Sequence, residues 1–216
     1  AAKGGNNDES HNHNDIGNFV VYFNGMPVLI DIGRGTYTAK TFSKQRYAIW
    51  SNTSDYHNLP TINGKQQLPG ATFKATNVNY SKRKNSSQFS LDIAKAYPED
   101  AGLKSWQRTV KLLRGNEVQL TDNVLFTKFE SVSQHFMTCF PVEIGKKGEV
   151  IIHARGKDFQ IVYETQMLHA TVEKVEMNSP EDKGVIASWG SDIYRINFSY
   201  KYNSLKSETM YQIKEK

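Results

Sequence analysis

Two histidines of the sequence, His11 and His13, flank a single asparagine and are followed at once by Asn14 and Asp15. Neutral imidazoles and a carboxylate are natural ligands of a zinc ion. In an extended segment, residues two apart point to the same face, so both rings and Asp15 would lie together. An H-x-H pair also occurs often without a metal, and hydrogen-bonded surface histidines are the plain alternative. A metal site therefore needs a further ligand from elsewhere in the chain.

Asp31 and His57 are the candidates for that further ligand. Asp31 lies on the second of two β-rich runs that surround Asn24-Gly25, a pair typical of a hairpin turn. In a straight hairpin, Asp31 would lie about five or six residues, on the order of 20 Å, from His13. One metal ion cannot bridge that distance.

Two arrangements solve this problem, and the sequence leaves both open. Either the segment 11–15 folds back over the hairpin, or Asp15 replaces Asp31 as the ligand. Strand parity adds a condition, because opposite residues of an antiparallel pair share a face. An even loop pairs Asp31 with Asn18, whereas a three-residue loop or a bulge pairs it with Phe19. Only the pairing with Phe19 places the side chain of Asp31 on the same face as the side chains of His11 and His13.

The elements that must position these residues are strands. Period-two alternation is repeated along the chain, as expected for half-buried antiparallel strands. The expected strands are 17–24, 27–33, 71–82, 87–97, 106–113, 117–128, 131–140, 149–154, 159–164, 171–177, 194–202 and 208–214. A single turn at 98–102 is the only helical candidate. No Gly/Ser-rich or Pro-rich linker divides the chain, so we expect one all-β domain over 1–216, a large antiparallel multi-stranded β-sandwich.

One stretch, residues 34–66, resists assignment as a strand and is long for a connection in a compact domain. Long loops of this kind are often functional. It carries cations and aromatic rings, among them Arg34, Tyr37 and Arg46, which suit an anionic sugar chain through charge and ring stacking. The alternative is a loop packed by its own aromatic side chains.

Composition excludes some classes of protein and favours none strongly. The net charge is +5, and an excess of this size suggests a nucleic-acid partner only weakly. No apolar run approaches the length of a membrane helix, and the first residues lack the apolar stretch of a signal peptide. We therefore expect neither a nucleic-acid partner nor a membrane span.

Five segments together resemble the heparinase II/III family of polysaccharide lyases. They are HNHNDIGNF (11–19), VVYFNGMPVLIDIG (20–33), YHNLPTING (56–64), AYP (96–98) and SWQRT (105–109). That family joins an N-terminal α/α toroid to a C-terminal β-sandwich, and this chain resembles only the sandwich. The resemblance implies that the toroid is missing here and that the parent is a bacterial periplasmic or secreted enzyme.

The resemblance also implies a reaction and a division of roles. Such lyases cleave uronic-acid-containing polysaccharides by β-elimination, with a base for the C5 proton and an acid for the leaving oxygen. His11 would sit at the catalytic cleft, and Asn12 would orient its ring or the sugar carboxylate. His13, Asp31 and His57 would hold a structural metal, commonly zinc. We expect the isolated chain to have little activity, because no complete acid–base set is visible in it.

Two functions from other classes compete with this interpretation. A noncatalytic glycan-binding β-sandwich would use exposed aromatic rings and would not need the His11-Asn12-His13 motif. A nucleic-acid binder is suggested by charge alone. The histidine motif argues against both.

Overall fold

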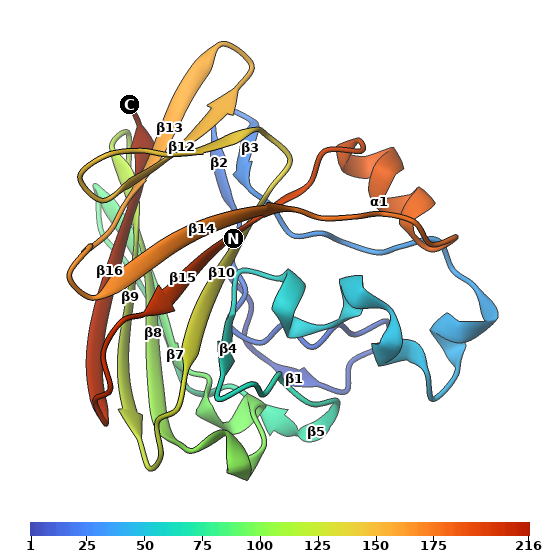
Figure 1. Ribbon diagram of the computed structural model, residues 1–216. Coiled ribbons are helices and arrows are strands. Elements are labelled where there is room, and N and C mark those ends of the chain that lie inside the picture. Colours follow the sequence, from blue (N-terminus) through green and yellow to red (C-terminus); the bar gives the residue numbers. More distant parts are fainter.

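The computed structural model describes residues 1–216, and antiparallel strands dominate it (Figure 1). The largest sheet has eight strands in the order β11-β12-β13-β16-β9-β8-β7-β6. Their bounds are β6 (Thr76–Lys82), β7 (Ser86–Asp92), β8 (Leu103–Leu113), β9 (Glu117–Phe126), β11 (Val142–Ile144), β12 (Glu149–Ala154), β13 (Lys157–Val162) and β16 (Lys206–Glu215).

A second sheet of four strands has the order β14-β15-β10-β4. Its strands are β4 (Pro60–Ile62), β10 (Val132–Thr138), β14 (Leu168–Lys174) and β15 (Tyr194–Tyr200). The two sheets pack through one apolar cluster, in which Leu120 and Tyr211 of the large sheet meet Phe136 and Phe198 of the small one, all fully buried. This arrangement confirms the expected all-β sandwich.

Alternation of side chains explains why these segments form strands. In β16, Ser207, Thr209, Tyr211 and Ile213 are buried, while every residue between them is exposed or only half-buried. Burying one face of each strand removes apolar area from water, at roughly 25 cal/mol per Å². The β-rich second half of the chain therefore folds as its sequence pattern predicts.

Two small pairs complete the strands: β1 (Asn6–Asn7) with β5 (Gly70–Lys74), and β2 (Val21–Phe23) with β3 (Met26–Leu29). The β2–β3 hairpin turns through Asn24 and Gly25, both at positive φ. A bulge follows, because Tyr22 pairs with Pro27 but Val21 pairs with Leu29, which leaves Val28 without a partner. This register, if continued, sets Asp31 opposite Phe19, the pairing that the bulge alternative predicts.

The hairpin is shorter than the expected runs 17–24 and 27–33, and the side chain of Asn58 explains why. Its Nδ2 donates to the carbonyl oxygens of Phe19, at 2.5 Å, and of Ile30, at 3.0 Å. An amide side chain thus lies where direct hydrogen bonds between the two strands would otherwise run. The two strands separate beyond this point, and the opening is filled by the loop that carries His57.

Several expected elements differ in detail. The run 71–82 is two strands, β5 and β6, because the backbone is interrupted at Ala75 and Asn77 adopts a left-handed φ of +53°. The run 87–97 ends as a strand at Asp92. The expected turn at 98–102 is present, as the 3-10 helix Glu99–Ala101.

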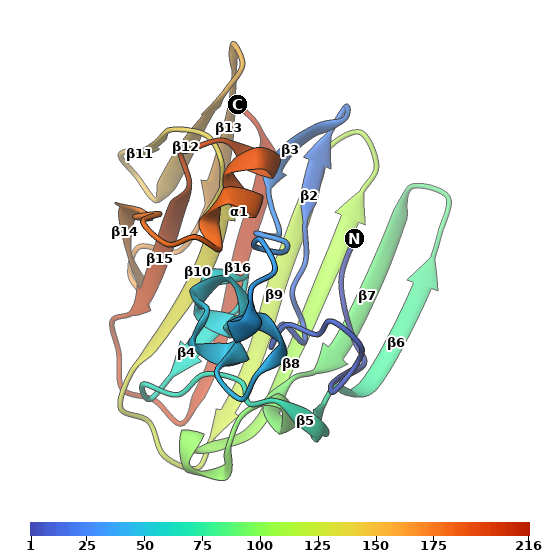
Figure 2. The ribbon, with the colours of Figure 1, turned by 90° about the vertical axis from the view of Figure 1, so that its right-hand side faces the viewer.

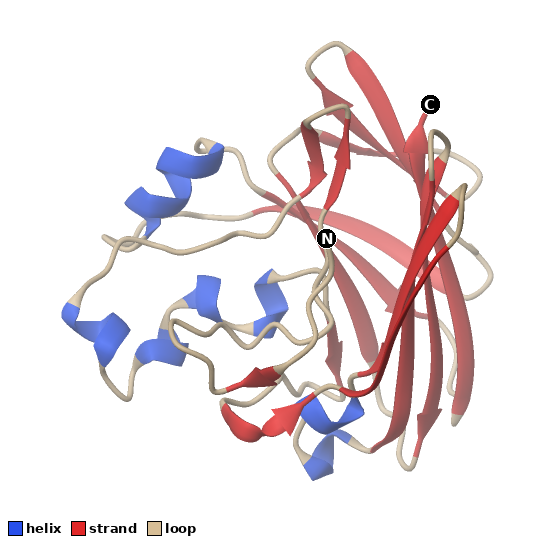
Figure 3. Cartoon of the chain, turned by 180° about the vertical axis from the view of Figure 1, so that it is seen from behind, coloured by secondary structure: helices blue, strands red, loops and turns tan.

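Helical structure gathers on one side of the sheets (Figure 3). The 3-10 helices are η1 (Ala39–Phe42), η2 (Arg46–Ala48), η3 (Trp50–Asn52), η4 (Ser54–Tyr56), η5 (Ala94–Ala96) and η6 (Glu99–Ala101), and α1 spans Asp182–Trp189. No helix is long and apolar enough to cross a membrane. The segment 34–66 is therefore a series of short turns that ends in β4.

Helix α1, which the sequence pattern does not predict, supports this segment (Figure 2). Trp50 donates Nε1–H to Asp182 at 2.7 Å, and the amide of Thr36 donates to the carbonyl of Glu181 at 2.7 Å. A Cβ placed on Gly184 would lie 2.6 Å from the Thr36 nitrogen. Helix and loop therefore touch backbone to backbone, which only glycine allows here.

Candidate metal and catalytic site

The histidine motif folds back on itself before the hairpin. The amide of Asn18 donates to the carbonyl of Asp15 at 3.0 Å, and Gly17 has a φ of +86°. His11 is also left-handed, with a φ of +58°. The motif is therefore a turn, and the assumption of an extended segment is wrong. The straight path that gave a separation of about 20 Å is therefore not followed, and the choice between Asp31 and Asp15 as ligand stays a prediction.

This turn brings His13 to Asp31 and His57. One potential ligand atom from each of the three residues lies within 4.8 Å of the others. The two imidazole rings have centroids 5.4 Å apart and are inclined by 53°. Two nitrogens and one carboxylate oxygen at this spacing match the donor set that zinc takes in proteins, with a fourth position left over.

His57 carries the clearest sign that this group lacks a component. The residue is 0% exposed, and neither ring nitrogen has a hydrogen-bond partner. Its Nδ1 lies 3.5 Å from Oδ2 of Asp31, too far for a good hydrogen bond. Unpaired buried polar atoms are costly, so a cation bound by one ring nitrogen of His57 and by the carboxylate of Asp31 fits the site.

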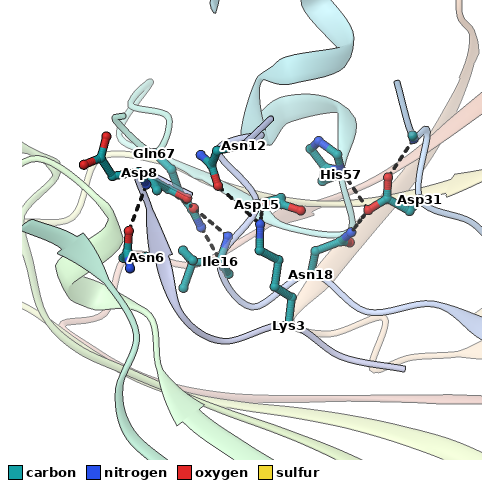
Figure 4. A network of polar contacts seen from close by, with 12 residues as sticks. Lys3, Asn6, Asp8, Asn12, Asp15, Ile16, Asn18, Asp31, His57 and Gln67 are labelled. Atoms are coloured by element: carbon teal, nitrogen blue, oxygen red, sulfur yellow. Dashed lines mark hydrogen bonds and ion pairs between the residues drawn. The ribbon is translucent and has the colours of Figure 1, made fainter. Parts of the chain in front are cut away.

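The charges of the three side chains suit a cation as well. Burial, reinforced by nearby His57, lowers the pKa of His13 to about 3, so this ring is neutral and free to bind a metal. Burial opposes ionisation of Asp31, but His57 and the amide of Gly33 outweigh it and hold the pKa of Asp31 well below its usual range. Asp31 is further fixed by Nδ2 of Asn18, at 2.5 Å from Oδ2 (Figure 4).

Asp15, the other candidate ligand, faces a different partner. Its carboxylate forms an ion pair with Lys3, and the ammonium of Lys3 also lies 3.4 Å from Oδ1 of Asn12 (Figure 4). Burial raises the pKa of Asp15, although His57 and Lys3 oppose that shift. The geometry therefore groups Asp31, and not Asp15, with the two histidines.

A small cavity next to His13 is lined also by His11, Arg34, Tyr37 and Arg46. The ring of His11 stacks on that of Tyr37, with centroids 5.7 Å apart, and its Nδ1 lies 3.1 Å from the phenolic oxygen. Its Nε2 has no hydrogen-bond partner in the chain. The guanidinium of Arg34 lies over the Tyr37 ring, 5.1 Å from its centre.

The remaining predicted binding residues are placed differently. Arg46 donates from Nε and Nη2 to the carbonyl of Asn12, at 3.1 and 2.7 Å, and from Nη1 to the carbonyl of Thr41. Asn12 is 6% exposed and does not line the cavity. Arg46 therefore braces the histidine turn in addition to lining the cavity, whereas the side chain of Asn12 is enclosed.

The aromatic residues of the long loop fall into a packed set and an exposed set, and sugar binding by the exposed set stays a prediction. Trp50 and Tyr56 pack edge to face with ring centroids 4.8 Å apart. Tyr37 is 39% exposed, and Phe42, whose ring lies 5.4 Å from that of Tyr37, is 70% exposed. The loop is thus packed by some of its aromatic residues and presents others at the rim of the cavity.

Sequence reasoning missed the residues that hold the ligands in place. Asn18 fixes Asp31, and Asn58 joins Phe19, Ile30 and, through Oδ1, the amide of Met137. Gln67 brackets Ile16 from both sides, accepting from its amide and donating to its carbonyl. Asn18 and Asn58 lie inside the quoted motifs, so the clue was an amide side chain in an otherwise apolar run.

Comparison with known proteins identifies the family and the fold. The family described as "Heparinase II/III-like, C-terminal" matches residues 1–195. A heparan sulfate lyase, HepC, from Pedobacter heparinus has a similar structure, with a TM-score of 0.77 at 16% identity over 99% of this chain and 32% of that one. A heparinase III structure gives a TM-score of 0.68 at 16% identity over 95% of this chain and 30% of that one.

No curated protein matches the sequence. The chain spans about a third of the length of the solved structures that it resembles. The family match covers nearly the whole chain, and the solved structures share its fold. The chain belongs to the heparinase II/III-like C-terminal family.

Proposed function

We propose that this chain is the C-terminal part of a polysaccharide lyase that cleaves a uronic-acid-containing chain by β-elimination. The observation that carries the proposal is the exposed His11 ring at the cavity, held by Tyr37 and beside Arg34. The family, and the heparan sulfate lyase whose structure this chain resembles, support the reaction class.

β-Elimination makes demands that these residues can meet in part. The C5 proton leaves to a base, the electron pair forms the C4–C5 double bond, and the C4–O bond breaks as the leaving oxygen takes a proton. Removal of the weakly acidic C5 proton requires a base within reach and neutralisation of the adjacent carboxylate. The Nε2 of His11 has no hydrogen-bond partner in the chain, and its ring lines the cavity, so it can serve as that base. Arg34 is placed to pair with a carboxylate or sulfate.

The metal in this proposal has a structural role. His13, Asp31 and His57 would hold one divalent ion, zinc by preference, and the ion would supply positive charge that joins the three segments. The unpaired nitrogens of buried His57 support this assignment. Since His13 is two residues from His11, fixing one ring fixes the backbone that presents the other.

The remaining catalytic groups would come from an N-terminal α/α toroid in the parent protein. The share of the relatives that this chain spans, about a third, supports a larger parent. We therefore expect little or no turnover from the chain alone, and we expect the parent to act in the periplasm or outside a bacterial cell.

Substitution of His11 in the full-length parent tests this function. His11→Ala should lower turnover by at least about 100-fold, as expected for loss of a general base, measured by the ultraviolet absorbance of the unsaturated product. Glycan binding should change little. His169→Ala, which alters an exposed histidine of β14, is the matched control. Unchanged turnover in His11→Ala would refute the catalytic role, and loss of glycan binding in step with turnover would favour a noncatalytic binding domain.

A further inference from the structure

Arg108 lies at the centre of β8 and is completely buried, with an exposed fraction of 0%. An arginine so deep in a sandwich requires every polar atom to be satisfied. Its Nε and Nη2 donate to the two carboxylate oxygens of Asp122 on β9, at 2.9 and 2.7 Å. Nη2 donates also to Oε1 of Gln134 on β10. Asp122 therefore neutralises the charge, and three N–H groups of the guanidinium point at the two sheets.

The other two N–H groups point at the segments that carry the metal ligands. Nη1 donates to the carbonyl of Asn58, at 2.8 Å, and to the carbonyl of Gly17, at 3.2 Å. All five N–H donors of the side chain are therefore used. No other side chain of the eight-stranded sheet forms a hydrogen bond to residues 11–18 or 56–58.

Both carbonyls lie next to residues that set the ligand positions. Asn58 follows His57, and Gly17 precedes Asn18, whose Nδ2 holds the carboxylate of Asp31. The amide of Asn58 in turn donates to Oδ1 of Asn18, at 3.0 Å. One planar guanidinium thus fixes the separation of the turn after His13 from the loop that carries His57.

We propose that Arg108 is a positioning residue for the metal centre: its planar fork sets the spacing of His13, Asp31 and His57. This inference rests on the proposed metal site. Because Asp122 cancels the charge of Arg108, the effect on the metal acts through geometry and not through the electric field of the guanidinium. Lysine keeps the charge but has one compact ammonium, which cannot reach two carbonyls and a carboxylate in one plane.

Zinc titration of the 216-residue chain and of Arg108→Lys tests the proposal, at a temperature where circular dichroism shows both to be folded. We expect Arg108→Lys to raise the zinc Kd about tenfold or more, the size seen when outer-shell partners are lost. Ile161→Ala, which truncates a buried residue of β13 in the sheet core, is the matched control. It lowers stability without touching the ligand segments and should leave the Kd within about twofold.

Each outcome decides the matter. A folded Arg108→Lys with the native Kd overturns the proposal, and so does an equal loss of affinity in Ile161→Ala. Should Arg108→Lys fail to fold, Gln134→Ala replaces it, because that change removes a neutral acceptor of the guanidinium, keeps the charge pair with Asp122 and contacts neither ligand segment. Weak zinc binding by Gln134→Ala supports the positioning role. Native affinity, or a failure of both variants to fold, refutes it.

Zinc titration of the native chain and of His13→Ala tests the metal site separately from the positioning role of Arg108. If the native chain binds no zinc, the proposed metal site is wrong and the positioning role falls with it. If the native chain binds zinc and His13→Ala does not, the site stands, and Arg108→Lys then tests the positioning role alone.

Discussion

The two packed sheets and the layer that covers them are stabilised by different kinds of interaction. We call residues 1–19 and 30–67 the site layer. The sheets bury alternating apolar side chains, as Leu120 and Ile213 illustrate. The site layer buries amides, hydroxyls and a histidine, including Asn18, His57 and Asn58. Its regular structure is limited to short strands and 3-10 turns.

This difference shows how each region tolerates change. Apolar contact is nondirectional, so a core accepts side chains of similar volume at modest cost. Buried hydrogen bonds are directional, and removal of one partner leaves the other unsatisfied. The sheets therefore act as a tolerant platform, whereas the site layer depends on a few specific atoms.

The largest effect is expected at a metal ligand. Asp31→Asn removes the only formal negative charge among the three ligands and should weaken zinc binding by about 1000-fold, or about 4 kcal/mol. Asp15→Asn should leave zinc affinity unchanged, because Asp15 pairs with Lys3. Metal analysis and zinc titration of both variants check this. A loss of zinc in Asp15→Asn alone would reverse the ligand assignment.

The second largest effect is expected from truncation of Asn58, whose side-chain amide joins the site layer to the hairpin. Asn58→Ala leaves two carbonyls and one amide without partners and should cost about 3 kcal/mol of unfolding free energy. Ile161→Val in the sheet core should cost only about 1 kcal/mol. Urea unfolding of both variants, each with excess chelator, measures the difference. Equal costs would mean that the two regions do not differ as described.

The stability of the chain should depend on pH through His135, a buried histidine of β10. Burial, aided by Arg195, lowers the pKa of His135 to about 4. An unfolded histidine has a pKa near about 6.5, so between these values only the unfolded chain binds the proton. Stability from this group is therefore complete above pH ~6.5 and is lost as the pH falls toward ~4, by about 3 kcal/mol.

His135→Gln should flatten this acid-side loss, whereas His169→Gln on an exposed position of β14 should not. Chemical unfolding at a series of pH values, in chelator, provides the comparison. If His135→Gln and the native chain lose stability in parallel, another group causes the loss.

The smallest effect is expected at the rim of the cavity. Tyr37→Phe removes an exposed hydrogen bond to His11 and should change stability by less than about 0.5 kcal/mol. Zinc affinity should stay the same, because Tyr37 contacts none of the three ligands directly. Thermal unfolding with and without zinc checks both points, and a threefold or greater change in zinc Kd would show that rim and metal pocket are coupled.

The sheets could be predicted from sequence because their signal is local. Alternation within a segment such as 87–92 or 208–214 is enough to define a strand and its buried face. Helix α1 could not be predicted in this way, since its place depends on the contact of Gly184 with a loop some 150 residues earlier. Its short sequence has no strong helical periodicity.

The three predicted metal ligands do lie together, but the path that brings them together could not be predicted from local pattern. The turn at Gly17 and the open end of the hairpin depend on Arg108 and Asn58, which come from distant parts of the chain. Spacing alone therefore suggested a distance of about 20 Å in a straight hairpin. The prediction that these three residues lie together came from the resemblance to the family motifs and not from periodicity.

The unpaired Val28 in the hairpin has a consequence for changes of chain length. Deleting that residue would close the bulge and leave Asp31 across from Phe19, because the shorter strand would lose its irregularity and its extra residue together. A deletion between Leu29 and Asp31 has no bulge to absorb it and would move Asp31 out of register with Phe19.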